Sequence, residues 1–570
     1  MRRFRKETES GEKSVRHALF FNTIGLMNRK KPVFSRTDLC FLVTAAVILV
    51  LHILKAPIGT GEADEHFYIT LGYRLFQGDA MFFDDWHIAQ MISVFLWPLT
   101  ALYHAFTGST AGIVLGFRYF YIAFNLLIGI AVYLRFRNHG YGAVCAAAAY
   151  MLFAPYNTFA LSYNSMGPGF LLLSAMLYPI EREDKFRLYL SGILYAWAVL
   201  NTPYLAVIFA VLTVITLVRP SRYSHTRWIV QFLGILTAAV IFLGIVLSRA
   251  SLPQIFSCLK YLIDPSHSAG ILRQFAVSMG KLVLAFNVFL LPMAAGFILV
   301  LQNRRAAEEV RQKWLRVAVV ICLLSILYIG VLRPYQAEMG GYMLVLIPVA
   351  LLGCEILLLY PAEPAVVLCI SLSLIDSLAV SLSSNVGPRA FSAPLITACA
   401  MTVLLIWESS LKPAWKYSAV GVILGVLLFF NVTFVYLGSG NYTEPVKNGP
   451  LAGLKDSPET VRNYEASLSD IEAINAMDGC EYANLITAQS WEYLALTKRM
   501  ASNSTYAYFW EQDQYTEAMD AYRILHPERY PAYYYLDTAG NRYEMKETDP
   551  WLARFTYLEP MKRGALFLAE

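Results

Sequence analysis

The chain places an apolar segment, Leu39-Cys-Phe-Leu-Val-Thr-Ala-Ala-Val-Ile-Leu-Val-Leu-His-Ile-Leu54, just before an acidic loop that opens Gly59-Thr-Gly-Glu-Ala-Asp-Glu-His-Phe-Tyr68. The same loop closes with Phe83-Asp-Asp-Trp-His87. The apolar segment is of a length and composition suited to a membrane span. Carboxylates just outside the hydrocarbon are either solvated or functional, because burying them unpaired is costly. These two segments therefore predict a span that delivers acid–base groups to a membrane surface.

The composition of the whole chain indicates a polytopic membrane protein. Of 570 residues, 57% are hydrophobic and only 15% are charged, and the mean hydropathy is +0.47. A soluble globular protein carries about a quarter charged residues. Further apolar runs recur downstream, for example at 228–247, 281–301, 343–360 and 417–437. The net charge of +5 says little about partners, and we predict membrane lipids and no nucleic acid as partners.

Basic residues predict how the chain is oriented in the membrane. Residues 1–37 contain ten Lys or Arg and no short apolar core, so we expect a cytoplasmic N-terminus without a cleavable signal peptide. The first span then leads outward, and the first loop, 58–111, is extracytoplasmic. Segment 88–106 is apolar enough to cross, but a crossing would put the basic clusters near Arg135, Arg219–Arg227 and Arg304–Arg316 outside. We therefore predict that 88–106 is a surface helix.

With that choice, the fold class is a mainly α polytopic protein with about thirteen transmembrane helices and a C-terminal α/β domain. The transmembrane catalytic domain is predicted at 38–437 and the extracytoplasmic domain at 438–570. The spans after the first are predicted near 112–134, 141–156, 165–180, 188–201, 203–218, 228–247, 281–302, 317–332, 342–360, 365–382, 392–408 and 417–437. In the tail, helices are expected near 457–477, 488–499 and 515–525, and strands near 481–487, 505–509, 532–536 and 564–569.

The acids of the first loop are candidates for catalysis. Asp64 stands where a helix running to about Gln77 begins, and an acid there suits both the free amides and the helix dipole. One interpretation is that all these acids are caps or solvated charges, and we adopt it for Glu62 and Asp79. For Asp64 we favour a functional role, because the loop is nearly free of cations that could neutralise the acid, Arg74 being the exception.

Other polar residues invite structural interpretations. Arg118 is expected to pair with Asp84 or Asp85. Asp376 lies deep in an apolar run, where nearby serines can satisfy it; an acid there is otherwise a functional candidate. The eight cysteines show no CxxC pair and no spacing typical of metal ligands.

The order of these motifs resembles the C-type (GT-C) membrane glycosyltransferases, in particular protein O-mannosyltransferases and lipid A aminoarabinose transferases. An Asp-Glu pair follows span one, then come an amphipathic helix, an Asp-rich His segment, a surface helix and Gly112-Ile-Val-Leu-Gly-Phe-Arg118. The resemblance implies transfer of a sugar from a polyprenyl-phosphate carrier, usually with inversion. It maps the essential first-loop acid onto Asp64 and its neighbour onto Glu65. The family's His-Pro-Pro is absent, since Ile88-Ala-Gln follows His87.

These residue types fit such a transfer. Asp64 is the candidate base for an acceptor hydroxyl, and Glu65 is the candidate to position the acceptor or the base. For substrate binding we name Asp84, Asp85 and His87, together with Arg273, Lys281 and Arg333 as cations for the leaving phosphate. The acceptor can be a glycan, a lipid or a protein. No cofactor is certain, but the same acids could hold a divalent metal.

Two other functions remain open at this stage. A transporter or flippase of lipid-linked saccharides would carry charged residues along a path in the spans, and Asp376 is the deep acid that fits it. A non-catalytic scaffold that displays the tail would leave the acidic loop unexplained.

Overall fold

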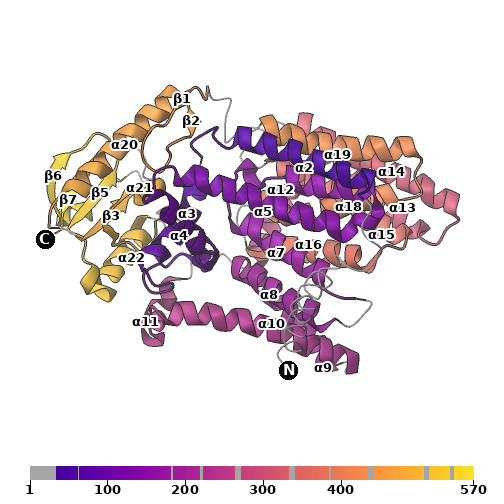
Figure 1. The fold of residues 1–570 in the computed structure, drawn as a ribbon, viewed down its shortest axis with the longest axis horizontal. Coiled ribbons are helices and arrows are strands. Elements are labelled where there is room, and N and C mark those ends of the chain that lie inside the picture. The colour runs from indigo at the N-terminus through magenta and orange to yellow at the C-terminus, as the bar shows by residue number, and fades with distance from the viewer. Residues whose placement is uncertain are drawn as a thin grey trace, which may run out of the picture.

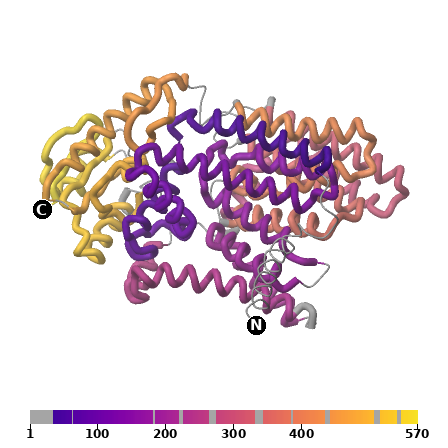
Figure 2. Tube along the Cα trace, in the orientation of Figure 1, coloured from indigo at the N-terminus to yellow at the C-terminus, as the bar shows by residue number. Residues whose placement is uncertain are grey.

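A computed structural model describes residues 34–61, 63–180, 184–218, 222–262, 271–332, 341–383, 387–433, 441–479, 481–505, 512–538 and 545–569. Figure 1 shows a helical bundle with a smaller α/β unit at one end of its long axis. The tube in Figure 2 shows the first-loop segment, in purple, between that unit and the bundle. The structure thus confirms the fold class, a mainly α chain of apolar helices with a small C-terminal sheet domain.

The bundle is built from helices that mostly follow the predicted apolar runs; the exception is the predicted span 281–302, which is divided between two helices, the first beginning at Ile271. The helices of the bundle are α2 (Arg36–Lys55), α5 (Ile113–Phe136), α6 (Tyr141–Leu152), α7 (Tyr163–Leu177), α8 (Lys185–Asn201), α9 (Ala206–Val218), α10 (Arg222–Leu247), α12 (Ile271–Phe286), α13 (Leu290–Asn303), α14 (Glu308–Leu327), α15 (Leu346–Leu359), α16 (Pro364–Ser383), α18 (Ile396–Glu408) and α19 (Pro413–Thr433). Short elements join them: η3 (Pro155–Asn157), α11 (Leu252–Cys258), η10 (Gly341–Val345) and α17 (Pro388–Ser392).

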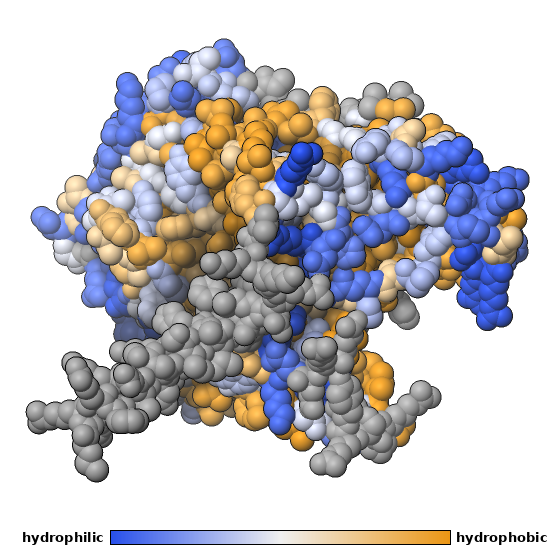
Figure 3. All heavy atoms as spheres, turned by 45° about the vertical axis from the view of Figure 1, so that its right-hand side comes forward, coloured by the Kyte–Doolittle hydropathy of each residue, from blue (hydrophilic) through white to orange (hydrophobic). Residues whose placement is uncertain are grey.

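Much of the bundle surface is apolar, as a lipid-facing surface must be. Figure 3 shows broad orange areas of apolar residues between areas of polar residues. Valines, leucines and isoleucines of α9 and α10 are exposed, among them Val207, Leu217, Val240 and Ile241. In a soluble protein such contiguous apolar surface would be a liability, whereas in a bilayer it is solvated by lipid tails.

Polar contacts at the two ends of the bundle show that α2 and α5 are antiparallel. At one end, Tyr133 near the end of α5 donates to Asp38 at the start of α2, with an O–O distance of 2.5 Å. At the other end, Arg118 near the start of α5 donates to the carbonyl of Ala56, just after α2, at 2.6 Å. We call this second end the first-loop end. The chain between α2 and α5 therefore leaves and re-enters the bundle at the same end.

This arrangement supports the surface placement predicted for 88–106. That segment forms η1 (Ile88–Ile92) and α4 (Ser93–Thr107), and it packs chiefly on α3 (Ala63–Gln77). One crossing by α4 would put the start of α5 at the wrong end. The predicted grouping of basic clusters also fits, because Arg135 pairs with Glu363, Arg311 donates to the Leu359 carbonyl and Arg227 to the Ile180 carbonyl, all at helix ends away from the first loop.

The number of spans stays a prediction. Ten helical stretches among the described residues are long and apolar enough to cross a membrane, and this number includes 88–107. Four of the thirteen predicted spans, α6, α7, α8 and α9, have 12, 15, 17 and 13 residues. A perpendicular crossing needs about 20 residues, so length alone does not assign these four.

The tail folds around a mixed five-stranded sheet in the order β4-β3-β5-β7-β6. Its strands are β3 (Tyr482–Ile486), β4 (Arg499–Met500), β5 (Tyr533–Asp537), β6 (Thr556–Pro560) and β7 (Gly564–Leu568), and its helices are α20 (Pro458–Ala476), α21 (Trp491–Ala495) and α22 (Gln512–Leu525). The predicted strands at 481–487, 532–536 and 564–569 and helices at 457–477 and 515–525 are confirmed. The expected helix at 488–499 shortens to α21. The expected strand at 505–509 falls almost wholly outside the described residues.

The tail does not pack as a separate body. A two-stranded ladder of β1 (Glu444–Pro445) and β2 (Lys455–Asp456) adjoins the first loop, where the Lys455 amide donates to the Pro57 carbonyl and the Gly59 amide donates to the Lys455 carbonyl, both at 2.7 Å. The loop and the tail also share two apolar cores, one around Phe67 and Trp491 and one around Trp86 and Tyr522. This shared burial places the tail directly against the loop that carries the candidate acids.

Candidate active site

Helix α3 presents Asp64 at its first turn. Asp64 is exposed, whereas the next residues along the helix, Glu65 and His66, are only 2% exposed. Further along α3, Tyr68 packs edge-on against Tyr163 at the start of α7, with ring centroids 6.0 Å apart. An acid at a helix start remains ionised easily, because the helix dipole and free amides favour negative charge there.

Glu65 is committed to an ion pair that the sequence did not reveal. Its two carboxylate oxygens accept from Nε and Nη2 of Arg118 at 2.7 and 2.9 Å, and both side chains are buried. The expectation that Arg118 pairs with Asp84 or Asp85 was therefore wrong. The start of α5 lies beside the start of α3, so Arg118 meets Glu65, whereas Asp84 of the second acidic group pairs with Arg529 of the tail. A paired carboxylate of this kind fixes the position of the helix start that carries Asp64.

The second acidic group forms part of a buried network, which we call the junction cluster. It contains Arg74, Asp79, Asp84 and Asp85 of the first loop and His526 and Arg529 of the tail. Arg529 donates to Asp79 at 2.7 Å and to Asp84 at 2.8 Å, and Arg74 donates to Asp79 at 2.7 Å. Arg74 also lies 3.4 Å from Asp85, and His526 lies 3.4 Å from Asp84. The interpretation of Asp79 as a solvated charge was wrong, because Asp79 is 4% exposed between two guanidiniums.

Two acids of the junction cluster, Asp79 and Asp85, have pKa values shifted in opposite directions. Burial alone would raise the pKa of Asp79, but the charges of Arg74 and Arg529 hold it below its usual range. Burial raises the pKa of Asp85 to about 6, with Arg74 opposing the rise. The difference arises because Asp79 has two guanidiniums in direct contact, whereas Asp85 faces one at longer range. Asp79 joins the loop to the tail through Arg529, whereas Asp85 faces Arg74 of the loop itself.

The three residues predicted to bind substrate in this segment are all buried. Asp84 is 2% exposed, Asp85 is 5% and His87 is 7%. The Nδ1 atom of His87 accepts from the Ala89 amide at 3.0 Å, and its ring packs edge-on against Phe67 at 4.3 Å. In this arrangement they support the loop, and a substrate role for them stays a prediction.

A strained loop between α6 and α7 lies close to Asp64. Tyr156 and Asn157 both adopt left-handed backbone conformations, with φ of 54° and 57°. For residues other than glycine this costs about 1–3 kcal/mol each and persists only where the surroundings enforce it. The half-buried Tyr156 side chain interacts electrostatically with Asp64, Tyr163, Tyr342 and Arg389. Burial, then the nearby Tyr163 and Asp64, raises the pKa of Tyr156 above its ordinary value, so its hydroxyl stays protonated.

Three helices hold this loop in place. The Tyr342 hydroxyl accepts from the Asn157 amide at 2.6 Å and donates to the Ala154 carbonyl. Lys55, at the end of α2, donates to the side-chain oxygen of Asn157 and to the Asn431 carbonyl on α19. Because Oδ1 of Asn157 faces Lys55, its Nδ2 is the other end of the amide, and this nitrogen is buried without a hydrogen-bond partner among the residues that the structure describes. Sequence reasoning missed this loop; Lys55 at the end of an apolar span was the one visible signal.

Two of the proposed phosphate-binding cations lie on α12, and the third is outside the described residues. Arg273 and Lys281 are exposed. Lys281 lies against Gly387, where an added Cβ would approach its Cδ to 2.9 Å, so it adjoins the short α17 that carries Arg389. Arg333 falls in the segment 333–340, which the structure does not describe. Together, Asp64, Tyr156, Tyr163, Lys281 and Arg389 form what we call the Asp64 site.

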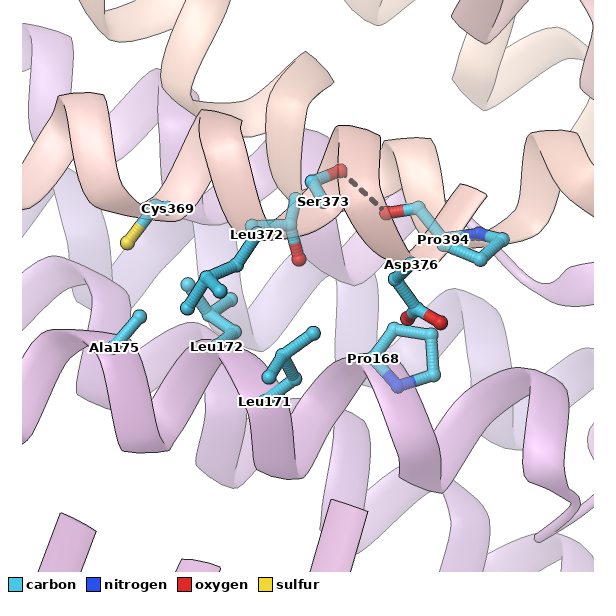
Figure 4. Close-up of a pocket in the computed structure, with 10 residues that line it drawn as sticks. Pro168, Leu171, Leu172, Ala175, Cys369, Leu372, Ser373, Asp376 and Pro394 are labelled. Carbon is cyan, nitrogen blue, oxygen red and sulfur yellow. Dashed lines mark hydrogen bonds between the residues drawn. The ribbon is translucent and has the colours of Figure 1, made fainter. Parts of the chain in front are cut away.

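Deep in the bundle, Asp376 lines a narrow cavity between α7 and α16. Its carboxylate points towards Pro168 in Figure 4, and neither oxygen has a hydrogen-bond partner among the described residues. The expectation that serines satisfy it was wrong, because Ser373 donates to the Pro394 carbonyl at 2.7 Å and Ser377 to the Phe391 carbonyl at 2.6 Å. A second deep acid, Glu355 on α15, is 4% exposed and was overlooked because it lies in a uniformly apolar run.

No three His, Cys, Asp or Glu side chains in the described parts of the chain are grouped to hold a metal ion. The acids of the junction cluster contact arginines instead.

Comparisons with known proteins return distant structural similarity. No protein-family model matches the chain, and no curated protein matches its sequence. Among solved structures, the chain is similar to ArnT from Cupriavidus metallidurans bound to undecaprenyl phosphate, with 15% identity over 93% of this chain and 97% of that one and a TM-score of 0.44. It is also similar to the same protein in the apo state, with 14% identity over 94% and 98% of the two chains and a TM-score of 0.44.

Proposed function

We propose that this protein is an integral membrane glycosyltransferase that moves a sugar from a polyprenyl-phosphate donor to an acceptor on the outer face of the membrane. The observation that carries the proposal is the contrast among the first-loop acids. Glu65, Asp79, Asp84 and Asp85 are buried beside arginines, and Asp64 is exposed at the start of α3. An acid that must reach a substrate needs this exposure, and its buried neighbours hold it in place.

In the proposed reaction Asp64 is the general base. It takes the proton of the acceptor hydroxyl as the oxygen attacks the anomeric carbon. The bond from the anomeric carbon to the phosphate oxygen breaks in the same displacement, so the configuration inverts and the polyprenyl phosphate leaves with added negative charge. In this proposal the charges of Arg389 and Lys281 stabilise that phosphate, and Arg389 forms paired hydrogen bonds with it.

Transfer by the purified protein tests this function. Radiolabelled polyprenyl-phosphate sugars are offered with candidate glycan, lipid and protein acceptors, with and without a chelator. We expect transfer by the wild type, a loss of at least about a hundredfold in Asp64→Asn, and wild-type activity in Glu528→Gln, an exposed tail acid. Full turnover by Asp64→Asn would exclude Asp64 as the base.

Asp376 gives a specific reason to retain transport as the second candidate. Its carboxyl is buried in the bundle and has no hydrogen-bond partner within the described ranges, as is typical of an acid on a path for ions or polar substrates. A flippase would move a labelled lipid-linked saccharide across vesicles without breaking its phosphate–sugar bond. If Asp376→Asn stopped such movement and Asp64→Asn did not, the transport function would replace the transferase.

A further inference from the structure

The loop from Phe153 to Ser162 is more constrained than a connection between two helices requires. Two successive residues, Tyr156 and Asn157, hold left-handed conformations that a glycine would adopt without cost. A chain that only joined α6 to α7 could place glycine there. Strain of this kind persists where it places a side chain for a purpose.

The side-chain ties on the loop act on Asn157, and the backbone amide of Tyr156 donates to the sulfur of Met343 at 3.4 Å, so the backbone of both residues is held. Tyr342 and Lys55 both contact Asn157, from η10 and α2. The element η10 packs on one side against η3, which contains Tyr156, and on another against α17, which carries Arg389. The phenol of Tyr156 thus lies within electrostatic reach of both the acid and the cation of the Asp64 site.

We propose that Tyr156 is a donor-contact residue whose hydroxyl donates a hydrogen bond to the phosphate of the lipid-linked sugar, beside Arg389. The inference rests on the proposed function and adds to it the residue that positions the leaving group relative to Asp64. Arg389 supplies charge, and the protonated phenol supplies a directed donor. Beside it lies the buried Nδ2 of Asn157, a donor with no hydrogen-bond partner in the described part of the chain.

Binding of a polyprenyl monophosphate without sugar tests this inference on the full-length protein. The Tyr156→Phe variant removes one hydroxyl and keeps the ring and the backbone. A hydrogen bond to a charged group corresponds to about a tenfold to a hundredfold change in affinity, and we expect a loss in that range. Tyr141→Phe, an exposed tyrosine at the opposite end of the bundle, is the matched control and should bind as the wild type does.

The ligand series separates the possible outcomes. A neutral polyprenol should bind the wild type and Tyr156→Phe equally, because it lacks the phosphate. If wild type and Tyr156→Phe bound the monophosphate equally, the inference would be overturned and the transferase function would stand. If only binding of the sugar-bearing donor weakened, Tyr156 would contact the sugar and the phosphate assignment would be wrong. If the wild type bound no polyprenyl phosphate, the proposed function itself would fail. Thermal melts of both tyrosine variants should match the wild type.

Discussion

The Asp64 site and the junction cluster take their acids from one loop, and the two regions use them in opposite ways. In the junction cluster, three carboxylates are buried beside two arginines and a histidine, and their contacts join the loop to the tail. At the Asp64 site, one carboxylate is exposed, and the other members of the site are the strained Tyr156, Tyr163 and the two cations Lys281 and Arg389. This difference in burial and pairing is the ground on which we propose Asp64, and not an acid of the junction cluster, as the catalytic residue.

The sharpest way to break this comparison is to neutralise one acid in each region. Asp64→Asn should lose at least about a hundredfold in transfer and keep its thermal stability, because Asn keeps the side-chain shape at an exposed position in the first turn of α3. Asp79→Asn should lose thermal stability and keep most of its transfer activity, since it leaves Arg74 and Arg529 buried with one carboxylate fewer to pair with. Breaking a buried pair costs about 3–5 kcal/mol. Transfer assays and thermal melts on the same two preparations measure both effects.

The opposite result for Asp79 would contradict this comparison. If Asp79→Asn remained fully stable but lost turnover, the junction cluster would belong to the chemistry. The distinction between the two regions would then be wrong.

Neutralising Glu65 gives a smaller effect between these two extremes. Glu65→Gln keeps one oxygen that can accept from Arg118 but loses the second charge-assisted bond. We expect a stability loss of about 1–3 kcal/mol and a reduction in turnover of less than about tenfold. Arg118→Lys, which keeps the charge but not the fork, should resemble it. A loss as large as that of Asp64→Asn would indicate that Glu65 itself contacts substrate.

The sequence predicted the bundle well because each span is encoded locally. Apolar runs of sufficient length give α5, α10 and α19 within a few residues. The partners of the acids were not predictable in this way. Arg529 lies 450 positions from Asp79, and Arg118 lies 53 positions from Glu65, so these pairs form only when distant elements pack. Strain at Tyr156 likewise leaves no composition signal, and the sequence analysis placed this residue at the end of the predicted span 141–156, whereas α6 ends at Leu152.

The pH dependence of stability tests the junction cluster more finely. Asp85 keeps its proton up to pH about 6 in the folded protein, compared with its ordinary value of 3.8 when unfolded. Between these values the folded state binds more protons, so Asp85 makes stability fall as pH rises through that window. Asp85→Asn should remove this contribution and be at least as stable as wild type at pH 7. Melts from pH 4 to 8, read as the difference between variant and wild type, isolate Asp85 from Asp79 and Asp84.

The smallest expected effect is that of Arg273→Gln, and its comparison with Arg389→Gln sharpens the boundary of the Asp64 site. Arg389 interacts electrostatically with Tyr156, whereas Arg273 is exposed two helical turns from Lys281 on α12 and has no comparable link to the site in the described residues. Arg389→Gln should therefore weaken binding of polyprenyl monophosphate by about tenfold or more. Arg273→Gln should change it by less than about twofold, because an exposed basic side chain near a membrane usually reaches the lipid headgroups. Equal losses in the two variants would mean that the phosphate site extends along α12 and that charge density, rather than the tyrosine loop, selects the donor.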